Sequence, residues 1–249
     1  MQERSGRTVP VLPISAAQEV IGLFPNVTEA FQLQYNYRAP DNFSAIPQAN
    51  KFTEPTHLLI NAYSASASEM VAASVKEQNG ATLYGQNSYG KGTMQSLLTL
   101  SDNSVLKMTT AKFYSPQGTA VNQVGVMPNI ATAAGEELFI SHKDQLINRY
   151  KNYKQLPDLK DVPTTKRFTV KMSLPMNWNG IQPKDVQLIQ LGGKEVPIDL
   201  KIVDERTITV VPKEKLTSKG QYILFVHPNW KSKTAKLMNQ GIYLEITVE

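Results

Sequence analysis

Two short segments of this chain combine residue types that could support nucleophilic catalysis. The first reads Asn-Ala-Tyr-Ser-Ala-Ser-Ala-Ser-Glu-Met over residues 61–70. Ser66 and Glu69 have the spacing of a capping box, in which the two side chains satisfy free amides at the start of a helix. The same position suits a nucleophilic serine, because the helix dipole and the free amides stabilise negative charge there. The Ala67 N–H would lie next to an oxyanion formed on a substrate carbonyl.

A serine nucleophile needs a base, and the three histidines of the chain are poor candidates for that role. His57 falls in an apolar strand pattern, whereas His142 and His227 fall in a later helix and a later domain. The alternative base is a lysine whose amine is desolvated, which lowers its pKa towards neutrality. The sequence therefore directs attention to lysines with close, uncharged neighbours.

The second segment, Tyr-Gly-Lys-Gly-Thr-Met-Gln over residues 89–95, contains such a lysine. Lys91 lies between two glycines that allow tight backbone packing, and its neighbours are apolar. If one helical turn forms here, the Gln95 amide lies on the same side at i+4 and orients the amine without adding charge. By itself, Gly-Lys-Gly is much more typical of a solvated loop than of a catalytic site. Its pairing with the serine segment favours a Ser-Lys site.

The elements that position these segments follow from hydrophobic periodicity. Strand, helix and strand alternate along the first part of the chain, which predicts an α/β arrangement. The expected helices are 14–24, 66–78 and 136–153, and the expected strands are 57–61, 81–85 and 104–114.

The last part of the chain has strand patterns with turn signals and no helical pattern. Residues 154–165 contain two prolines and no sustained period, which predicts a domain boundary near residue 160. We therefore assign residues 1–158 to an α/β domain and residues 164–249 to an all-β, immunoglobulin-like sandwich. Gly192-Gly193 indicates a hairpin between two of its strands. Six strands are expected, at 168–174, 186–191, 196–202, 207–211, 221–227 and 241–248.

Composition excludes several functional classes. Hydrophobic residues make up 41% of the 249 residues, which is enough for a core, and the net charge is +5. The absence of cysteine excludes disulfides and cysteine nucleophiles, and the three scattered histidines suggest no metal cluster. No metal or organic cofactor is implied. No basic run suggests nucleic-acid binding, no apolar stretch is long enough to span a bilayer, and residues 1–6 do not resemble a signal peptide.

The paired segments resemble the carboxy-terminal processing proteases, also called tail-specific proteases, which are serine peptidases with a Ser-Lys dyad. The resemblance covers about residues 14–132 and includes Gly125-Val-Met-Pro-Asn129. It implies that Ser66 is the nucleophile, Lys91 the base and Gln95 the residue that assists the base. Glu69 also matches a family position. The implied reaction is hydrolysis of an extended polypeptide through an acyl-enzyme.

The chain departs from the family pattern at its start. Members carry an Arg-x-Asn-x-Gly-Gly loop that completes the oxyanion hole, whereas only Arg4-Ser5-Gly6 occurs here, so Gly6 is the candidate second donor. The upstream part of the protease core and a PDZ-like domain are also missing. We therefore expect the protease core to be incomplete at its N-terminus.

Three segments of the final domain, residues 168–176, 207–212 and 220–226, resemble bacterial surface-layer immunoglobulin-like modules. Together, the two resemblances imply an exported or cell-envelope protein that acts on polypeptides. They leave open a catalytically silent surface or scaffolding fragment as the alternative.

Overall fold

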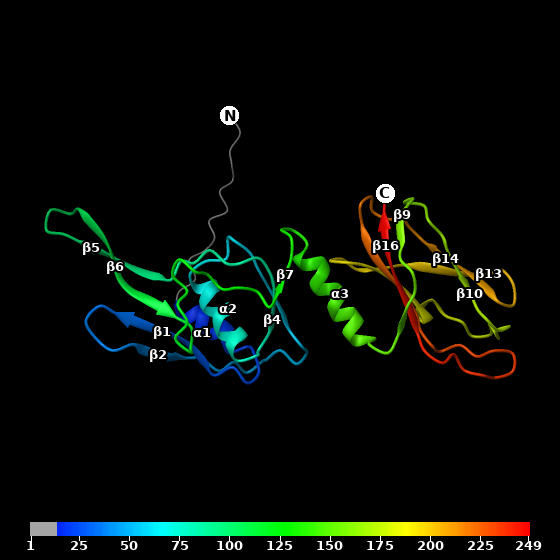
Figure 1. Ribbon diagram of the computed structural model, residues 1–249, viewed down its shortest axis with the longest axis horizontal. Helices are drawn as coiled ribbons and strands as arrows, with labels where there is room; N and C mark the ends of the chain where they lie inside the picture. The colour runs from blue at the N-terminus through cyan, green and yellow to red at the C-terminus, as the bar shows by residue number, and fades with distance from the viewer. Residues whose placement is uncertain (1–13) are drawn as a thin grey trace, which may run out of the picture. The chain divides into compact units, whose positions relative to one another are not determined.

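The computed structural model describes residues 14–249 and divides the chain into two compact units, which can be followed in Figure 1. One unit ends at Glu137 and the other comprises Leu138–Glu249. The division falls after the first residue of helix α3 (Glu137–Arg149), whereas the sequence analysis placed the whole helix in the first domain. The physical reason is that Leu146, with Phe139 packed against it, belongs to an apolar cluster of the second unit.

The first unit contains one parallel and one antiparallel sheet. The parallel sheet has the order β3-β4-β7 and the antiparallel sheet has the order β2-β1-β6-β5. The expected strands and helices are present, and the alternation Phe31-x-Leu33-x-Tyr35 is a strand signal that the sequence analysis missed. The elements are α1 (Ile14–Ile21), β1 (Glu29–Tyr35), β2 (Asp41–Ser44), β3 (His57–Ile60), α2 (Ala67–Glu77), β4 (Thr82–Gly85), β5 (Thr93–Thr99), β6 (Val105–Tyr114) and β7 (Ile130–Ala131).

Helix α2 is the central helix of this unit. Its residues from Met70 to Val75 are all buried, and it packs against α1, β1 and β4. The Ser74 hydroxyl donates a 2.6 Å hydrogen bond to the Glu29 carbonyl, which joins the helix to β1. This burial fixes the direction in which the first turn of α2 points.

The parallel sheet brings the two chemically interesting segments to the same edge. Strands β3 and β4 pair in parallel, from His57 opposite Thr82 to Ile60 opposite Gly85. The serine segment follows β3 and the lysine segment follows β4, so both begin at carboxyl ends of adjacent strands. This edge is the usual site of ligand binding in open parallel sheets.

The second unit is built from two β-sheets and the helix α3. The sheets have the orders β10-β14-β13 and β12-β11-β15-β16-β8, with β9 also paired to β16. Val170 and Ile208 of the first sheet share a buried cluster with Leu188 and Leu224 of the second, so the two sheets enclose one core. The strands are β8 (Lys154–Gln155), β9 (Leu159–Val162), β10 (Phe168–Lys171), β11 (Val186–Gln190), β12 (Glu195–Val196), β13 (Ile198–Ile202), β14 (Thr207–Pro212), β15 (Gln221–Val226) and β16 (Ile242–Val248), with a 3₁₀ turn η1 at Pro183–Asp185.

All six strands expected in this part of the chain are present, although Val196–Ile202 divides into β12 and β13. The Gly192-Gly193 hairpin is also present, because β11 and β12 pair antiparallel and Gly192 has a φ of 69°. The left-handed conformation at Gly192 is one that glycine adopts without strain. The immunoglobulin-like class of this unit stays a prediction.

A buried histidine lies in this second unit beside the residues that follow α3. The Nδ1 atom of His227 is 2.7 Å from the Tyr153 hydroxyl, and its Nε2 atom is 2.9 Å from Oε1 of Gln187. An amide oxygen only accepts, so Nε2 carries the hydrogen and Nδ1 accepts from Tyr153. Burial lowers the pKa of His227, although the carboxylates of Asp185 and Glu195 oppose that shift.

The second unit is therefore expected to lose stability in mild acid. The unfolded chain binds a proton at His227 near the ordinary pKa of about 6.5, whereas the folded chain resists it, so the unfolding free energy falls as the pH drops below that value. His142 contributes in the same direction, because burial lowers its pKa and, secondarily, so does the Arg149 charge.

Urea unfolding followed by tryptophan fluorescence measures this effect, because both tryptophans, Trp178 and Trp230, lie in the second unit. Midpoints should be lower at about pH 5 than at about pH 8. The double variant His142→Asn/His227→Asn should reduce that difference. An unchanged pH dependence in the double variant would contradict the assignment.

Candidate active site

Ser66 has a backbone conformation that a serine adopts only under strain. It is the N-cap residue of α2 and has φ 58° and ψ −120°. A positive φ costs free energy in a residue with a Cβ atom, and such strain is concentrated at functional sites. A serine on a strained turn between a strand and a helix is the arrangement known as a nucleophile elbow, which projects the hydroxyl outward.

The amide that follows Ser66 is available for an oxyanion. In the described part of the chain, the Ala67 N–H has no backbone or side-chain acceptor. It is the first residue of α2, where the helix leaves amides unpaired and its dipole is positive. The predicted oxyanion donor therefore has the free hydrogen that this role requires. Gly6, the second predicted donor, lies outside the described residues.

The turn that leads to Ser66 is held by local hydrogen bonds. The Asn61 side-chain oxygen accepts from the Tyr63 N–H at 2.9 Å, and the Ser64 hydroxyl oxygen accepts from the Asn61 N–H at 3.1 Å. The Ser64 carbonyl accepts from the Tyr89 N–H at 2.9 Å. This last bond joins the serine segment directly to the lysine segment.

Glu69 joins the two segments more extensively. Its side chain is fully buried, with 0% exposure, and its carboxylate accepts four hydrogen bonds. Oε2 accepts from the N–H groups of Ser66 and Lys91, each at 2.8 Å. Oε1 accepts from the Ser88 hydroxyl at 2.5 Å and from the Gly90 N–H at 2.6 Å. One side chain thus fixes the backbone of both residues of the predicted dyad.

This arrangement extends the predicted role of Glu69. The capping-box interaction with Ser66 is present, but it accounts for only one of the four donors. A buried carboxylate needs several hydrogen bonds to compensate for its desolvation, and here the donors come from two loops that are distant in sequence. Sequence spacing could reveal the helix cap but not the contacts to residues 88–91.

The glycines beside Lys91 permit a close approach to another backbone segment. Gly90 has a φ of 86°, and its carbonyl accepts from the Gln123 N–H at 2.8 Å. A Cβ atom on Gly92 would lie 2.4 Å from the Asn122 backbone nitrogen, which no side chain could tolerate. The prediction that these glycines allow tight packing is consistent with both contacts.

The side chain of Lys91 is exposed, although the sequence analysis expected it to be desolvated. Its backbone is fixed through Glu69, whereas within residues 14–249 no hydrogen bond joins its amine to the Ser66 hydroxyl. The glycines allow the backbone to pack closely, but the apolar neighbours leave the lysine side chain exposed. The described chain thus positions the lysine without burying it.

The predicted helical turn at Gln95 is wrong. Gln95 is exposed and lies in β5, directly after a bulge between Met94 and Gln95 in its pairing with β6. The pairing with β6 imposes an extended backbone there, which local sequence spacing does not reveal. The i+4 argument that placed the amide beside Lys91 therefore does not apply.

Ser88 is a supporting residue that the sequence analysis missed. Its hydroxyl donates to Glu69 and accepts from the Val126 N–H at 2.6 Å, and it is buried. Val126 belongs to the Gly-Val-Met-Pro-Asn segment, whose Asn129 side chain accepts from the Leu83 N–H at 2.8 Å. That segment thus supports the lysine loop and β4, and only its sequence proximity to Gly-Lys-Gly could have singled out Ser88.

Within residues 14–249, no group of three or more His, Cys, Asp or Glu side chains could hold a metal ion. Over the same residues, no helix is both long and apolar enough to cross a bilayer.

Sequence comparisons find relatives of the segment that contains this strand-turn-helix geometry. The sequence model of peptidase family S41 matches residues 14–132, just under half of the chain. Over 77 residues, the chain is 43% identical to the carboxy-terminal-processing protease of Bartonella bacilliformis, which covers 31% of this chain and 18% of the relative. Over 99 residues, it is 32% identical to the carboxy-terminal processing protease CtpA of Bacillus subtilis. This match covers 40% of this chain and 21% of the relative.

Among solved structures, the chain is similar to the photosystem II D1 C-terminal processing protease. The sequence identity is 27% and the TM-score is 0.46, over 48% of this chain and 31% of that one. The chain spans less than a fifth of the length of the first curated relatives it matches, 18% and 15%.

Proposed function

We propose that this chain carries the nucleophile and base of a serine endopeptidase that uses a Ser-Lys dyad. The observation that carries the proposal is the strained conformation of Ser66 at the start of α2, with a free Ala67 amide beside it. Such strain persists only where the surrounding structure holds it, and Glu69 does so through the Ser66 N–H. A supporting observation is that the Glu69 carboxylate also accepts a hydrogen bond from the Lys91 N–H.

The proposed reaction begins with attack of the Ser66 hydroxyl oxygen on a peptide carbonyl. The neutral Lys91 amine takes the hydroxyl proton, and the Ala67 N–H stabilises the tetrahedral oxyanion. Lys91 then gives that proton to the leaving amine as the peptide C–N bond breaks, which leaves an acyl-enzyme at Ser66. Water hydrolyses the ester by the same proton path in reverse and restores both residues.

The substrate and location belong to the same proposal. The relatives' names describe processing of carboxyl termini, which supports an extended polypeptide as the substrate class. Some of those names also place the relative in the chloroplast, which is consistent with the exported or envelope location that the sequence resemblance implies. The proposed second domain is an immunoglobulin-like module at that location.

A second candidate function is a catalytically silent fragment with a structural role. The exposure of the Lys91 side chain favours it, because the proposed role as a base depends on removing that amine from water. The two candidates make different predictions about the reactivity of Ser66.

Labelling with a serine-reactive fluorophosphonate probe separates them. An assembled site should acquire the probe at Ser66, identified by mass mapping, and the Ser66→Ala variant should not. Ser68→Ala is the matched control, because Ser68 lies in the same turn of α2 and should not affect labelling. Equal labelling of wild type and Ser66→Ala, or none in the wild type, would favour the silent fragment.

A further inference from the structure

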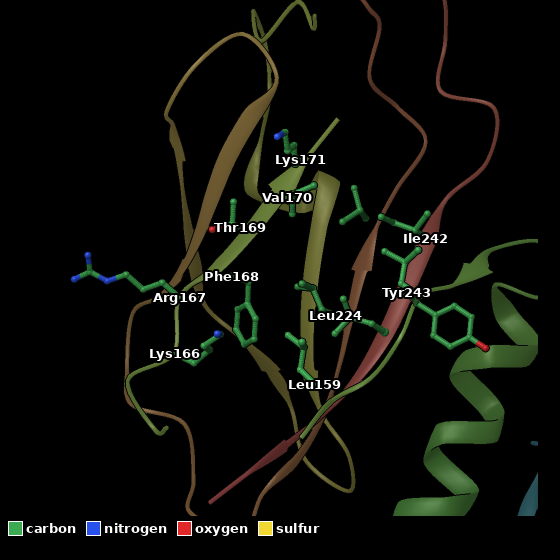
Figure 2. Close-up of a pocket in the computed structure, with 13 residues that line it drawn as sticks. Leu159, Lys166, Arg167, Phe168, Thr169, Val170, Lys171, Leu224, Ile242 and Tyr243 are labelled. Carbon is green, nitrogen blue, oxygen red and sulfur yellow. The ribbon is translucent and has the colours of Figure 1, made fainter. Parts of the chain in front are cut away.

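The second unit has an unpaired strand edge beside an apolar cavity. Strand β10 pairs with β14 on one side, and within residues 14–249 no strand pairs with its other edge. A cavity of about 310 Å³ lies along β10, and Figure 2 shows its lining. Leu224 and Val226 of β15 and Ile242 and Leu244 of β16 contribute apolar side chains to it.

The pairing register shows which groups of β10 face the open edge. Met172, directly after β10, donates to the Arg206 carbonyl at 2.7 Å, so Met172 and Arg206 form a hydrogen-bonded pair. Antiparallel ladders alternate, so Val170 and Phe168 also bond to β14, whereas the N–H and C=O groups of Thr169 point away from it. Lys171 lies two residues further along the strand, so its N–H and C=O groups also point away from β14. Both residues therefore offer main-chain donors and acceptors at the edge that no other group within residues 14–249 occupies.

The side chains along β10 alternate between buried and exposed positions. Phe168 and Val170 are buried against the core, whereas Arg167, Thr169 and Lys171 are exposed. Lys166 also lines the cavity, and no Asp or Glu does. In the described chain, none of these three cations forms an ion pair, although Lys171 lies close enough to Asp204 to help lower the pKa of that carboxyl.

We propose that this edge binds an extended peptide in which apolar and acidic residues alternate. The peptide would add as a strand to β10, taking its hydrogen bonds from the backbones of Thr169 and Lys171. Side chains on one face of the added strand would enter the apolar cavity. Side chains on the other face would lie beside Arg167 and Lys171. Acidic side chains are favoured there because their charge is complementary to these two cations.

This binding site is independent of the proposed peptidase chemistry. It lies wholly in the second unit, and its residues take no part in the Ser66 site. The test therefore uses the whole chain with Ser66→Ala, so that no peptide is cleaved and binding alone is measured.

The probe is a fluorescein-labelled octapeptide of alternating leucine and glutamate, followed by anisotropy. A peptide of the same composition with its leucines in one block, and one with lysine replacing glutamate, should each bind at least about tenfold more weakly. Equal binding of the alternating and blocked peptides would overturn the proposal, because strand addition requires alternation.

A proline substitution tests the main-chain contacts. Thr169→Pro removes an outward N–H without breaking a bond to β14, so peptide affinity should fall about tenfold while tryptophan fluorescence keeps its folded signal. Ile202→Pro is the matched control, because Ile202 is exposed on β13 at the opposite edge of the same sheet and should retain full affinity. Equal affinities for the two variants would contradict the assignment to β10.

Charge reversal tests the basic side of the site. Arg167→Glu/Lys171→Glu should weaken binding about tenfold or more, whereas Lys201→Glu/Lys215→Glu, an equal change in charge at exposed lysines that do not line the cavity, should not. Analytical sedimentation of the same proteins shows whether a second copy of this chain, instead of a peptide, occupies the β10 edge. A dimer that Thr169→Pro dissociates, with no peptide binding, would overturn the proposal in favour of self-association.

Discussion

Replacement of Ser66 by alanine is expected to reduce peptide hydrolysis by a factor on the order of 10⁴ to 10⁶, because it removes the nucleophile and leaves only the oxyanion site. Replacement of Lys91 by alanine should cost about as much, and the double variant should be no worse than either single one, since the two residues act as a unit. The measurement is kcat on a fluorogenic polypeptide. It requires a form of the protein that shows basal turnover.

Conservative variants sharpen this prediction. Lys91→Arg should be as inactive as Lys91→Ala, because a guanidinium does not lose its proton near neutral pH. Ser68→Ala and Lys107→Ala are the matched controls, since neither residue belongs to the proposed dyad, and both should retain turnover. Hydrolysis that persists in Ser66→Ala or Lys91→Arg would exclude the Ser-Lys assignment.

The Glu69→Gln substitution is expected to loosen both loops of the site at once. The carboxylate has two acceptor oxygens that face four donors, and an amide would replace one acceptor with a donor. Two buried donors would then face an N–H₂ group, which should reduce the unfolding free energy of the first unit by about 2–4 kcal/mol. Turnover should fall with it, because the strained backbone at Ser66 loses its support.

Amide hydrogen exchange locates the effect. Protection of the Gly90 and Lys91 amides should decrease in Glu69→Gln, because these groups donate to the carboxylate. The control is Glu19→Gln on α1, an exposed residue whose replacement should change neither exchange nor unfolding. Unaltered protection at residues 90 and 91 in Glu69→Gln would show that the carboxylate does not hold the loop.

Local signals in the sequence were sufficient for the elements that form through their own periodicity. The helix at Ala67–Glu77 and the strands at His57–Ile60 and Thr82–Gly85 follow from apolar spacing and from the capping pair. By contrast, the conformation at Gln95 is set by pairing with β6, and the unit to which α3 belongs is set by the contacts of Leu146. Both depend on partners that are distant in sequence, so the local pattern predicted a different conformation at Gln95 and a different unit for α3.

By itself, the sequence determined which residues could do chemistry: a serine at a helix start, a lysine between glycines, and a glutamate three residues after the serine. Only the tertiary structure decided how they are held. Parallel pairing of β3 and β4 brings the two segments to one edge, and burial of Glu69 there recruits donors from both. The physical reason is that a desolvated carboxylate must be satisfied by whichever amides the fold places around it, and spacing along the chain does not encode that set.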